Sequence, residues 1–218
     1  ASNTAIGRSA LAANTTGTQN TAVGFCAMYS NTTGANNVAV GRCALKLNTT
    51  GACNVAVGSF ALDSNTSGGC NTAIGRCALS ANTTASNNTA VGYLALDANT
   101  TANDSTAIGR NSNLCNTTGC QNTSVGSNTF NRNTTGNFNT AVGYIANYLN
   151  TTGTENASFG YRAAQCGSTG SYNTSIGASA GCQLTTGTNN TFLGHIAGRT
   201  GSPATVTTGS NNIVIGNN

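Results

Sequence analysis

The sequence predicts an all-β chain, a parallel β-solenoid (β-roll or β-helix) of about twelve 17-residue rungs, each rung being one turn of the coil. Three observations predict this fold. The pentapeptide Asn-Thr-Ala-(Val/Ile)-Gly, or a close variant, recurs every 17 residues from Asn3 to Asn190 without an insertion. Its fourth place always holds a sizeable apolar residue, and an Asn-Thr-Thr-Gly turn closes most units. Seventeen residues are too few for a pair of helices, which excludes the longer helical repeats.

The regularity of the repeat also predicts the domain organisation. We expect β-solenoid repeats over residues 1–199, an insertion loop over 200–211 and a partial terminal rung at 212–218. The chain begins shortly before one strand and ends shortly after another, so each end of the stack is expected to be an open β-edge ready for another copy.

Each element of the unit has an expected place in the coil. We expect a strand at Thr-Ala-Val, with the fourth-place residue, such as Val23, pointing into the core and Leu11 and its equivalents closing the other side. The preceding Ala would then face outward, because side chains alternate along a strand. Small outward residues would let another solenoid approach, which predicts a parallel homo-oligomer. Packing of the Ala inside one narrow coil is the alternative.

The composition fits such a stack. Asn and Thr account for 34 and 37 of the 218 residues, whereas 6% of the residues are charged. Stacked rungs place identical side chains about 4.8 Å apart. Amides and hydroxyls can bond to their own copies along the stack, while a column of like charges would repel.

Several functions are excluded by what the chain lacks. A net charge of +4 is too small for an extended nucleic-acid-binding surface, and no apolar run is long enough to span a bilayer. Four Asp and Glu residues and the single His195 leave little for acid–base catalysis, and Asp97 lies six rungs from His195. We therefore expect no enzyme, no cofactor, no metal site, no nucleic-acid partner and no membrane insertion.

The nine cysteines predict an oxidising compartment. Stacked residues lie within the Cα spacing that a disulfide allows. The candidate pairs are Cys26 with Cys43, Cys53 with Cys70, Cys115 with Cys120 across one turn, and Cys166 with Cys182. Cys77 is left unpaired or available for an intermolecular bond. Metal binding is the rival interpretation of the clustered thiols, and the absence of a C-x-x-C motif speaks against it.

The turns contain a column of N-glycosylation sequons. The candidate acceptors are Asn14, Asn31, Asn48, Asn65, Asn82, Asn99, Asn116, Asn133 and Asn150. One acceptor per rung would be crowded, so partial occupancy is expected. With the cysteines, the sequons predict an extracellular location, on a cell or virion surface.

The unit Asn-Thr-Ala-Val-Gly-(Tyr/Phe/Arg)-x-Ala-Leu-x-x-Asn-Thr-Thr-Gly resembles repeats in fibrous proteins of phage tails and large viruses and in bacterial surface fibres. It is also similar to the Ala-(Ile/Val)-Gly units of trimeric autotransporter adhesin heads, whose period is shorter. The resemblance covers Asn3 to Gly216 and implies an extended extracellular fibre. The nine cysteines depart from both groups, and the resemblance transfers no binding residue.

These features predict a structural subunit or segment of an extracellular filament or surface appendage. It would assemble by stacking of solenoid ends, be stapled by inter-rung disulfides and be glycosylated, with itself as partner, head-to-tail or laterally. The alternative is an adhesin that contacts glycans or a host surface through Tyr93, Tyr144, Tyr161 and Tyr172. Arg8, Arg42, Arg76 and Arg110, on alternate rungs, would form a sugar- or polyanion-binding stripe, or serve only solubility. An ice-binding solenoid is less favoured, because the tandem Thr lie in a turn.

Overall fold

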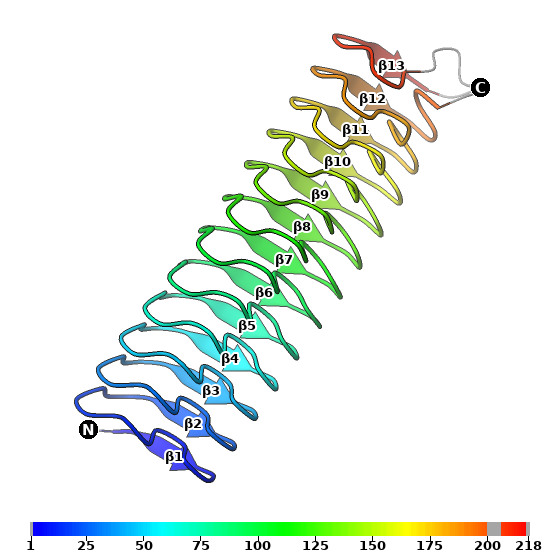
Figure 1. The fold of residues 1–218 in the computed structure, drawn as a ribbon. Helices are drawn as coiled ribbons and strands as arrows, with labels where there is room; N and C mark the ends of the chain where they lie inside the picture. The colour runs from blue at the N-terminus through cyan, green and yellow to red at the C-terminus, as the bar shows by residue number, and fades with distance from the viewer. Residues whose placement is uncertain (1, 200–205, 217–218) are drawn as a thin grey trace. The chain divides into compact units, whose positions relative to one another are not determined.

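The computed structural model describes residues 2–199 and 206–216 and confirms a parallel β-solenoid with 17-residue rungs (Figure 1). The chain divides into two compact units, Ala1–Ser105 and Thr106–Asn218, which we describe separately. Residues 200–205 of the predicted insertion loop and residues 217–218 of the predicted terminal rung lie outside the described residues.

Every described strand spans three residues and begins one place after the first residue of its rung. In the first unit the strands are β1 (Thr4–Ile6), β2 (Thr21–Val23), β3 (Val38–Val40), β4 (Val55–Val57), β5 (Thr72–Ile74) and β6 (Thr89–Val91). In the second unit they are β7 (Thr106–Ile108), β8 (Thr123–Val125), β9 (Thr140–Val142), β10 (Ala157–Phe159), β11 (Thr174–Ile176), β12 (Thr191–Leu193) and β13 (Ile213–Ile215).

Within each unit, consecutive strands pair in parallel and in register. Ala5 pairs with Ala22 between β1 and β2, and Ser158 pairs with Ser175 between β10 and β11. Equivalent places of the repeat therefore stack directly above one another, as the sequence predicts. We call each such stack of equivalent places a column.

The expected orientation of the strand side chains is wrong. The third-place residues, such as Ala22 and Ala39, are fully buried. The fourth-place residues face outward, and Ile74, for example, is 40% exposed. The interior is closed by the second predicted apolar site, where Met28 and Leu45 are fully buried. We call the fourth-place residues the outer aliphatic column and the third-place residues the inner column.

Two buried Asn columns converge on one carbonyl in each rung. Asn20 Nδ2 and Asn31 Nδ2 donate to the carbonyl oxygen of Gly34 at 2.8 and 3.0 Å. Along the stack, Asn31 Nδ2 also donates to Asn14 Oδ1 at 2.8 Å, and the backbone N–H of Asn37 donates to Asn20 Oδ1 at 3.0 Å. The amides thus tie both ends of a rung to its turn and tie neighbouring rungs together.

The second unit repeats this arrangement. Asn139 Nδ2 and Asn150 Nδ2 donate to the carbonyl oxygen of Gly153 at 2.9 and 3.1 Å. Asn150 Nδ2 also donates to Asn133 Oδ1 at 3.2 Å. We call the first-place residues the strand Asn column and the residues that open each Asn-Thr-Thr-Gly turn the turn Asn column.

The Gly after each strand is required by its surroundings. Gly58 has a φ of +136°, and a Cβ there would lie 2.6 Å from the carbonyl oxygen of Gly75 in the next rung. Both the left-handed backbone and the close approach exclude a side chain. The Gly column therefore lets the rungs stack where the chain leaves the strand.

Replacing one member of the turn Asn column should destabilise the fold. Asn48 Nδ2 donates to Asn31 Oδ1 at 2.7 Å and to the Gly51 carbonyl at 2.9 Å, and Asn48 Oδ1 accepts from Asn65 Nδ2 at 2.8 Å. Asn48→Ala leaves buried groups without these partners, so we expect a loss of about 2–4 kcal/mol in the free energy of unfolding, measured with urea. The exposed Thr50→Ala is the control, with a change below about 0.5 kcal/mol. Equal urea midpoints for the two variants would contradict the stabilising role of the turn Asn column.

The two classes of Gly should respond differently to Ala. Gly58→Ala meets both the positive φ and the Gly75 carbonyl, so we expect it to cost roughly 3 kcal/mol. Gly69→Ala, in a turn, brings its Cβ no closer than 3.1 Å to the Ala52 carbonyl and is expected to cost less than about 1 kcal/mol. Thermal unfolding of the two variants side by side measures the difference. A similar loss in both would show that close stacking does not constrain Gly58.

Candidate functional site

The predicted disulfides are not formed: all nine cysteines are free thiols. The predicted stacking itself is correct, since the N–H of Cys43 bonds to Phe25 in the rung of Cys26, and the N–H of Cys70 bonds to Ala52 in the rung of Cys53. No candidate forms a disulfide, and Cys77 is also a free thiol. The candidates are Cys26, Cys43, Cys53, Cys70, Cys115, Cys120, Cys166 and Cys182.

The geometry of stacking accounts for the free state of the in-register pairs. Cys26 and Cys43 occupy equivalent places, so their side chains point the same way and their Cβ atoms stay about as far apart as their Cα atoms, about 4.8 Å. A disulfide needs Cβ atoms about 3.5–4.5 Å apart. The Cα spacing fits a disulfide, but the parallel Cβ directions do not.

The turn Asn column is not available as a row of glycan acceptors. Asn14 is half-buried, and the side chains of the other candidates are at most 1% exposed. The candidates are Asn14, Asn31, Asn48, Asn65, Asn82, Asn99, Asn116, Asn133 and Asn150. The Nδ2 atom that would carry a glycan instead donates to the turn carbonyl and, along the stack, to the next amide, as Asn65 Nδ2 does to Asn48 Oδ1. A glycan on a buried member would remove these bonds and has no space.

The predicted filament subunit is therefore corrected. Free thiols remove the disulfide staples on which that function was built, and burial of Asn31 to Asn150 removes the predicted row of glycans from those turns. The structure supports the solenoid and leaves a different surface as the candidate functional site.

That surface is the outward face of the strands, which we call the strand face. In the first unit it contains the outer aliphatic column, with Val40 and Ile74 37% and 40% exposed, and the strand Thr column beside it. In the second unit the same column includes Ile108, Phe159 and Ile176, which are all exposed. Sequence reasoning missed the surface because it placed these residues in the core.

Three Arg residues of the next exposed column, Arg8, Arg42 and Arg76, lie over aromatic rings. The guanidinium carbon of Arg8 is 4.8 Å from the centroid of Phe25, and that of Arg76 is 5.6 Å from the centroid of Tyr93. In the second unit, Tyr144 and Tyr161 stack with centroids 5.8 Å apart. Cation–π contacts within the chain thus explain why Arg and aromatic residues stand on neighbouring rungs.

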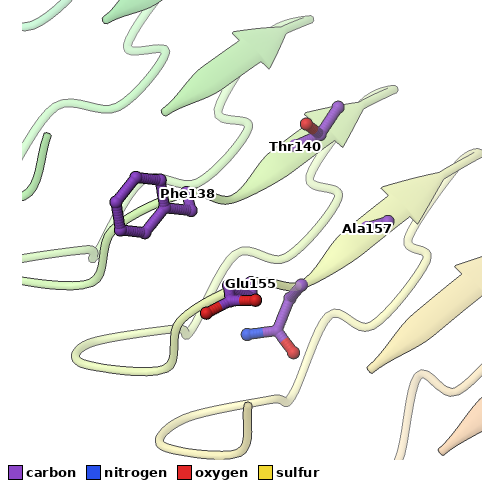
Figure 2. A pocket seen from close by; sticks show the side chains of 5 residues that line it. Phe138, Thr140, Glu155 and Ala157 are labelled. Atoms are coloured by element: carbon purple, nitrogen blue, oxygen red, sulfur yellow. The ribbon is translucent and has the colours of Figure 1, made fainter. Parts of the chain in front are cut away.

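Two cavities open on the second unit. One, of about 500 Å³, is lined by Phe138, Thr140, Glu155, Asn156 and Ala157 (Figure 2). The other, of about 190 Å³, is lined by Arg162, Gln165, Cys166, Ser179, Cys182, Gln183 and Arg199. The sequence analysis singled out neither, although the exposed Phe138 and the single carboxylate beside it were visible signals.

Across residues 2–199 and 206–216, no three His, Cys, Asp or Glu side chains gather closely enough to hold a metal ion. Over the same ranges there is no helix with the length and apolarity of a membrane span.

Comparisons with protein-family models, with curated proteins and with solved structures give no match to this chain. The class of protein is therefore defined by the fold alone, a parallel β-solenoid with a 17-residue repeat.

The thiols should differ in reactivity according to their burial. Cys53 and Cys70 are exposed, whereas Cys43 is buried. Burial also raises the pKa of the Cys77 and Cys182 thiols, which lowers their thiolate fraction at pH 8. We expect Ellman's reagent with peptide mapping to label Cys53 and Cys70 first and Cys43 last, and to count nine thiols after unfolding without a reductant. A count of seven or fewer would show a disulfide.

Proposed function

We propose that the chain is a structural assembly module that associates side by side with copies of itself through the strand face. The observation that carries the proposal is the outward direction of the outer aliphatic column, in which Ile74, Ile108 and Ile176 are between 40% and 42% exposed. Contiguous exposed apolar surface of this kind marks interaction sites in soluble proteins.

Strand propensity alone does not require aliphatic residues at this place. Thr has a comparable preference for strands and tolerates water, and it fills most of the neighbouring outward column, as at Thr72 and Thr89. Val, Ile, Leu or Phe nevertheless occupies the fourth place of each repeat. Removal of these side chains from water by a partner explains the choice, at about 25 cal/mol per Å² of buried apolar area.

The repeat itself points to a second copy as the partner. The strand face repeats along each unit with the rung spacing of about 4.8 Å, and another copy presents the same spacing in register. Neither outward column carries a charged residue in any strand, so two copies can meet without burying an unpaired charge. Lateral contact of identical faces therefore satisfies packing and electrostatics together.

The finer resemblance, to repeats of viral, phage and bacterial fibres and of adhesin heads, is part of this proposal, since side-by-side association would suit such proteins. The predicted surface location rested on disulfides and glycans and remains a prediction. The predicted glycan or host partner and the expected lack of enzymatic activity are likewise untested.

A charge placed on the strand face should prevent association. We expect the unchanged chain to form a discrete oligomer in light scattering after size exclusion, and Ile74→Lys to shift it to monomer at micromolar concentration. Burying an unpaired ammonium at the contact costs several kcal/mol. Ile74 is already 40% exposed, so the fold should keep its circular dichroism spectrum.

Leu47→Lys is the matched control, because Leu47 is 42% exposed and lies directly before Asn48 of the turn Asn column, away from the strand face. It adds the same charge and should leave the oligomer intact. A monomeric unchanged chain, or equal dissociation by both variants, would overturn the proposal.

A further inference from the structure

The last place of each rung lies two residues before the next strand, ahead of the strand Asn, and we call these places the pre-strand column. This column changes character in the second unit. Elsewhere it holds mostly Asn, Gln or Asp, but Phe138, Glu155 and Tyr172 occupy it on three consecutive rungs. Backbone bonds fix the order: the N–H of Glu155 donates to Asn137 at 3.1 Å, and the N–H of Tyr172 donates to Thr154 at 3.0 Å. One carboxylate therefore lies between two aromatic residues along the stack.

Neither backbone preference nor burial accounts for the aromatic residues. Phe138 and Tyr172 have φ values of 58° and 60°, in the left-handed region that Asn and Asp tolerate better than bulky side chains. Both are 56% exposed, so the core gains little from them. The same φ recurs along this column, as at Asn87 and Gln121, so the feature that distinguishes Phe138 and Tyr172 is their exposed aromatic surface, which points to a ligand.

The structure supplies space beside these side chains. The cavity of about 500 Å³ is lined by Phe138 and Glu155 and by the start of β9 and β10 (Figure 2). Ala157 stands where the neighbouring strands have Thr140 and Thr174, so the missing hydroxyl and methyl groups widen the cavity at this rung. Its volume is within the range of small-molecule sites.

The charges around the cavity select the ligand. In the last two places of each rung and the first two places of the next, from Cys120 to Thr191, Glu155 is the one charged residue. A carboxylate beside an aromatic face attracts an organic cation, through charge and through the ring's quadrupole. Within the described residues no three His, Cys, Asp or Glu side chains gather around Glu155, and a single carboxylate is a poor site for a metal ion.

We propose that Phe138, Glu155 and Tyr172 form a binding site for an alkylammonium group, of the quaternary kind found in choline and in trimethyllysine. The cation lies against the Phe138 ring with Glu155 as its counter-charge, and Tyr172 stands on the next rung, outside the residues that line the cavity. All three groups belong to one chain, so the site does not depend on lateral association.

Calorimetric titration with choline chloride tests the site. We expect choline to bind and its uncharged isostere, 3,3-dimethyl-1-butanol, to bind at least about tenfold more weakly, because the isostere has the same shape without the charge. A peptide carrying trimethyllysine, titrated in parallel, distinguishes a protein source of the ammonium from a free metabolite by its relative affinity.

Two substitutions taken from the column itself separate the contributions. Glu155→Gln and Phe138→Asn introduce residues that stand at the same place as Gln121 and Asn87, so the rungs should stack unchanged. Each should weaken choline binding about tenfold. Asp104→Asn, in the same column of the first unit, removes an equal charge away from the aromatic pair and should have no effect.

Equal binding of choline and its isostere, unchanged affinity in Glu155→Gln, or binding of a methyl glucoside in place of choline would overturn the proposal. The titration is repeated on Ile74→Lys. The same affinity there shows that binding and association are separate properties, and loss of binding only in that monomeric chain would contradict a site within one chain.

Discussion

The carbonyl oxygen of the turn Gly is the group on which the rest of each rung depends. It accepts one amide from the strand Asn column and one from the turn Asn column, as Gly51 does from Asn37 at 2.9 Å and from Asn48 at 2.9 Å. An amide can donate to this carbonyl and still accept from the next rung, so the pattern can propagate along the stack. A carboxylate only accepts, and a glycosylated amide loses a donor, which excludes both from these columns. The same buried bonds explain the Asn-rich composition and the failure of the sequons as glycan sites.

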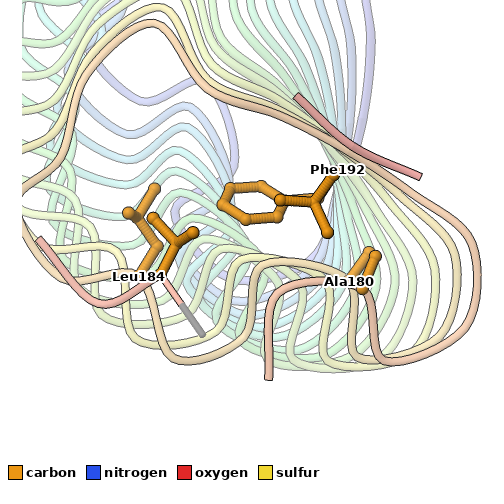
Figure 3. Close-up of a cluster of buried hydrophobic side chains, with 6 residues drawn as sticks. Ala180, Leu184 and Phe192 are labelled. Atoms are coloured by element: carbon orange, nitrogen blue, oxygen red, sulfur yellow. The ribbon is translucent and has the colours of Figure 1, made fainter. Parts of the chain in front are cut away.

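The amide columns also leave a narrow interior, and this width decides which strand side chains can be inside. Where the opposite wall carries Leu or Met, the inner column is Ala, as at Ala39 beside Leu45. In the last described rungs the sizes exchange: Phe192 fills the inner column, and a Cβ at Gly181 or Gly198 would collide with its ring. Figure 3 shows the Phe192 ring pointing into the interior on the side of Leu184, and Ala180 belongs to the same buried cluster. Large residues enter the coil where the opposite place is Gly.

This exchange explains how much of the fold could be predicted. The period, the strand positions and the stacking follow from the sequence because they depend on spacing alone. The side on which Val23 or Ile74 lies does not, since apolar size favours burial while the width of the coil forbids it. The compensation between Phe192 and Gly198 was the available signal. The disulfides failed for a related reason, because Cα spacing can be derived from the period, whereas Cβ direction depends on where each place lies on the coil.

Residues can vary, and so acquire a function, in the columns that take no part in the buried amide hydrogen bonds or the close Gly contacts. The strand and turn Asn columns and the Gly column are bound to their neighbours, so they vary little: Ser105, Gly167 and Leu184 are departures from Asn. The outer aliphatic column keeps one chemical character along both units, as an extended contact with a periodic partner requires. The pre-strand column varies between Gln, Asn, Cys, Asp, Phe, Glu and Tyr, so it can place a local site on a particular rung. Phe138 and Glu155 stand beside the one rung whose strand begins with Ala, and this coincidence of two departures separates a ligand site from ordinary drift of an exposed column.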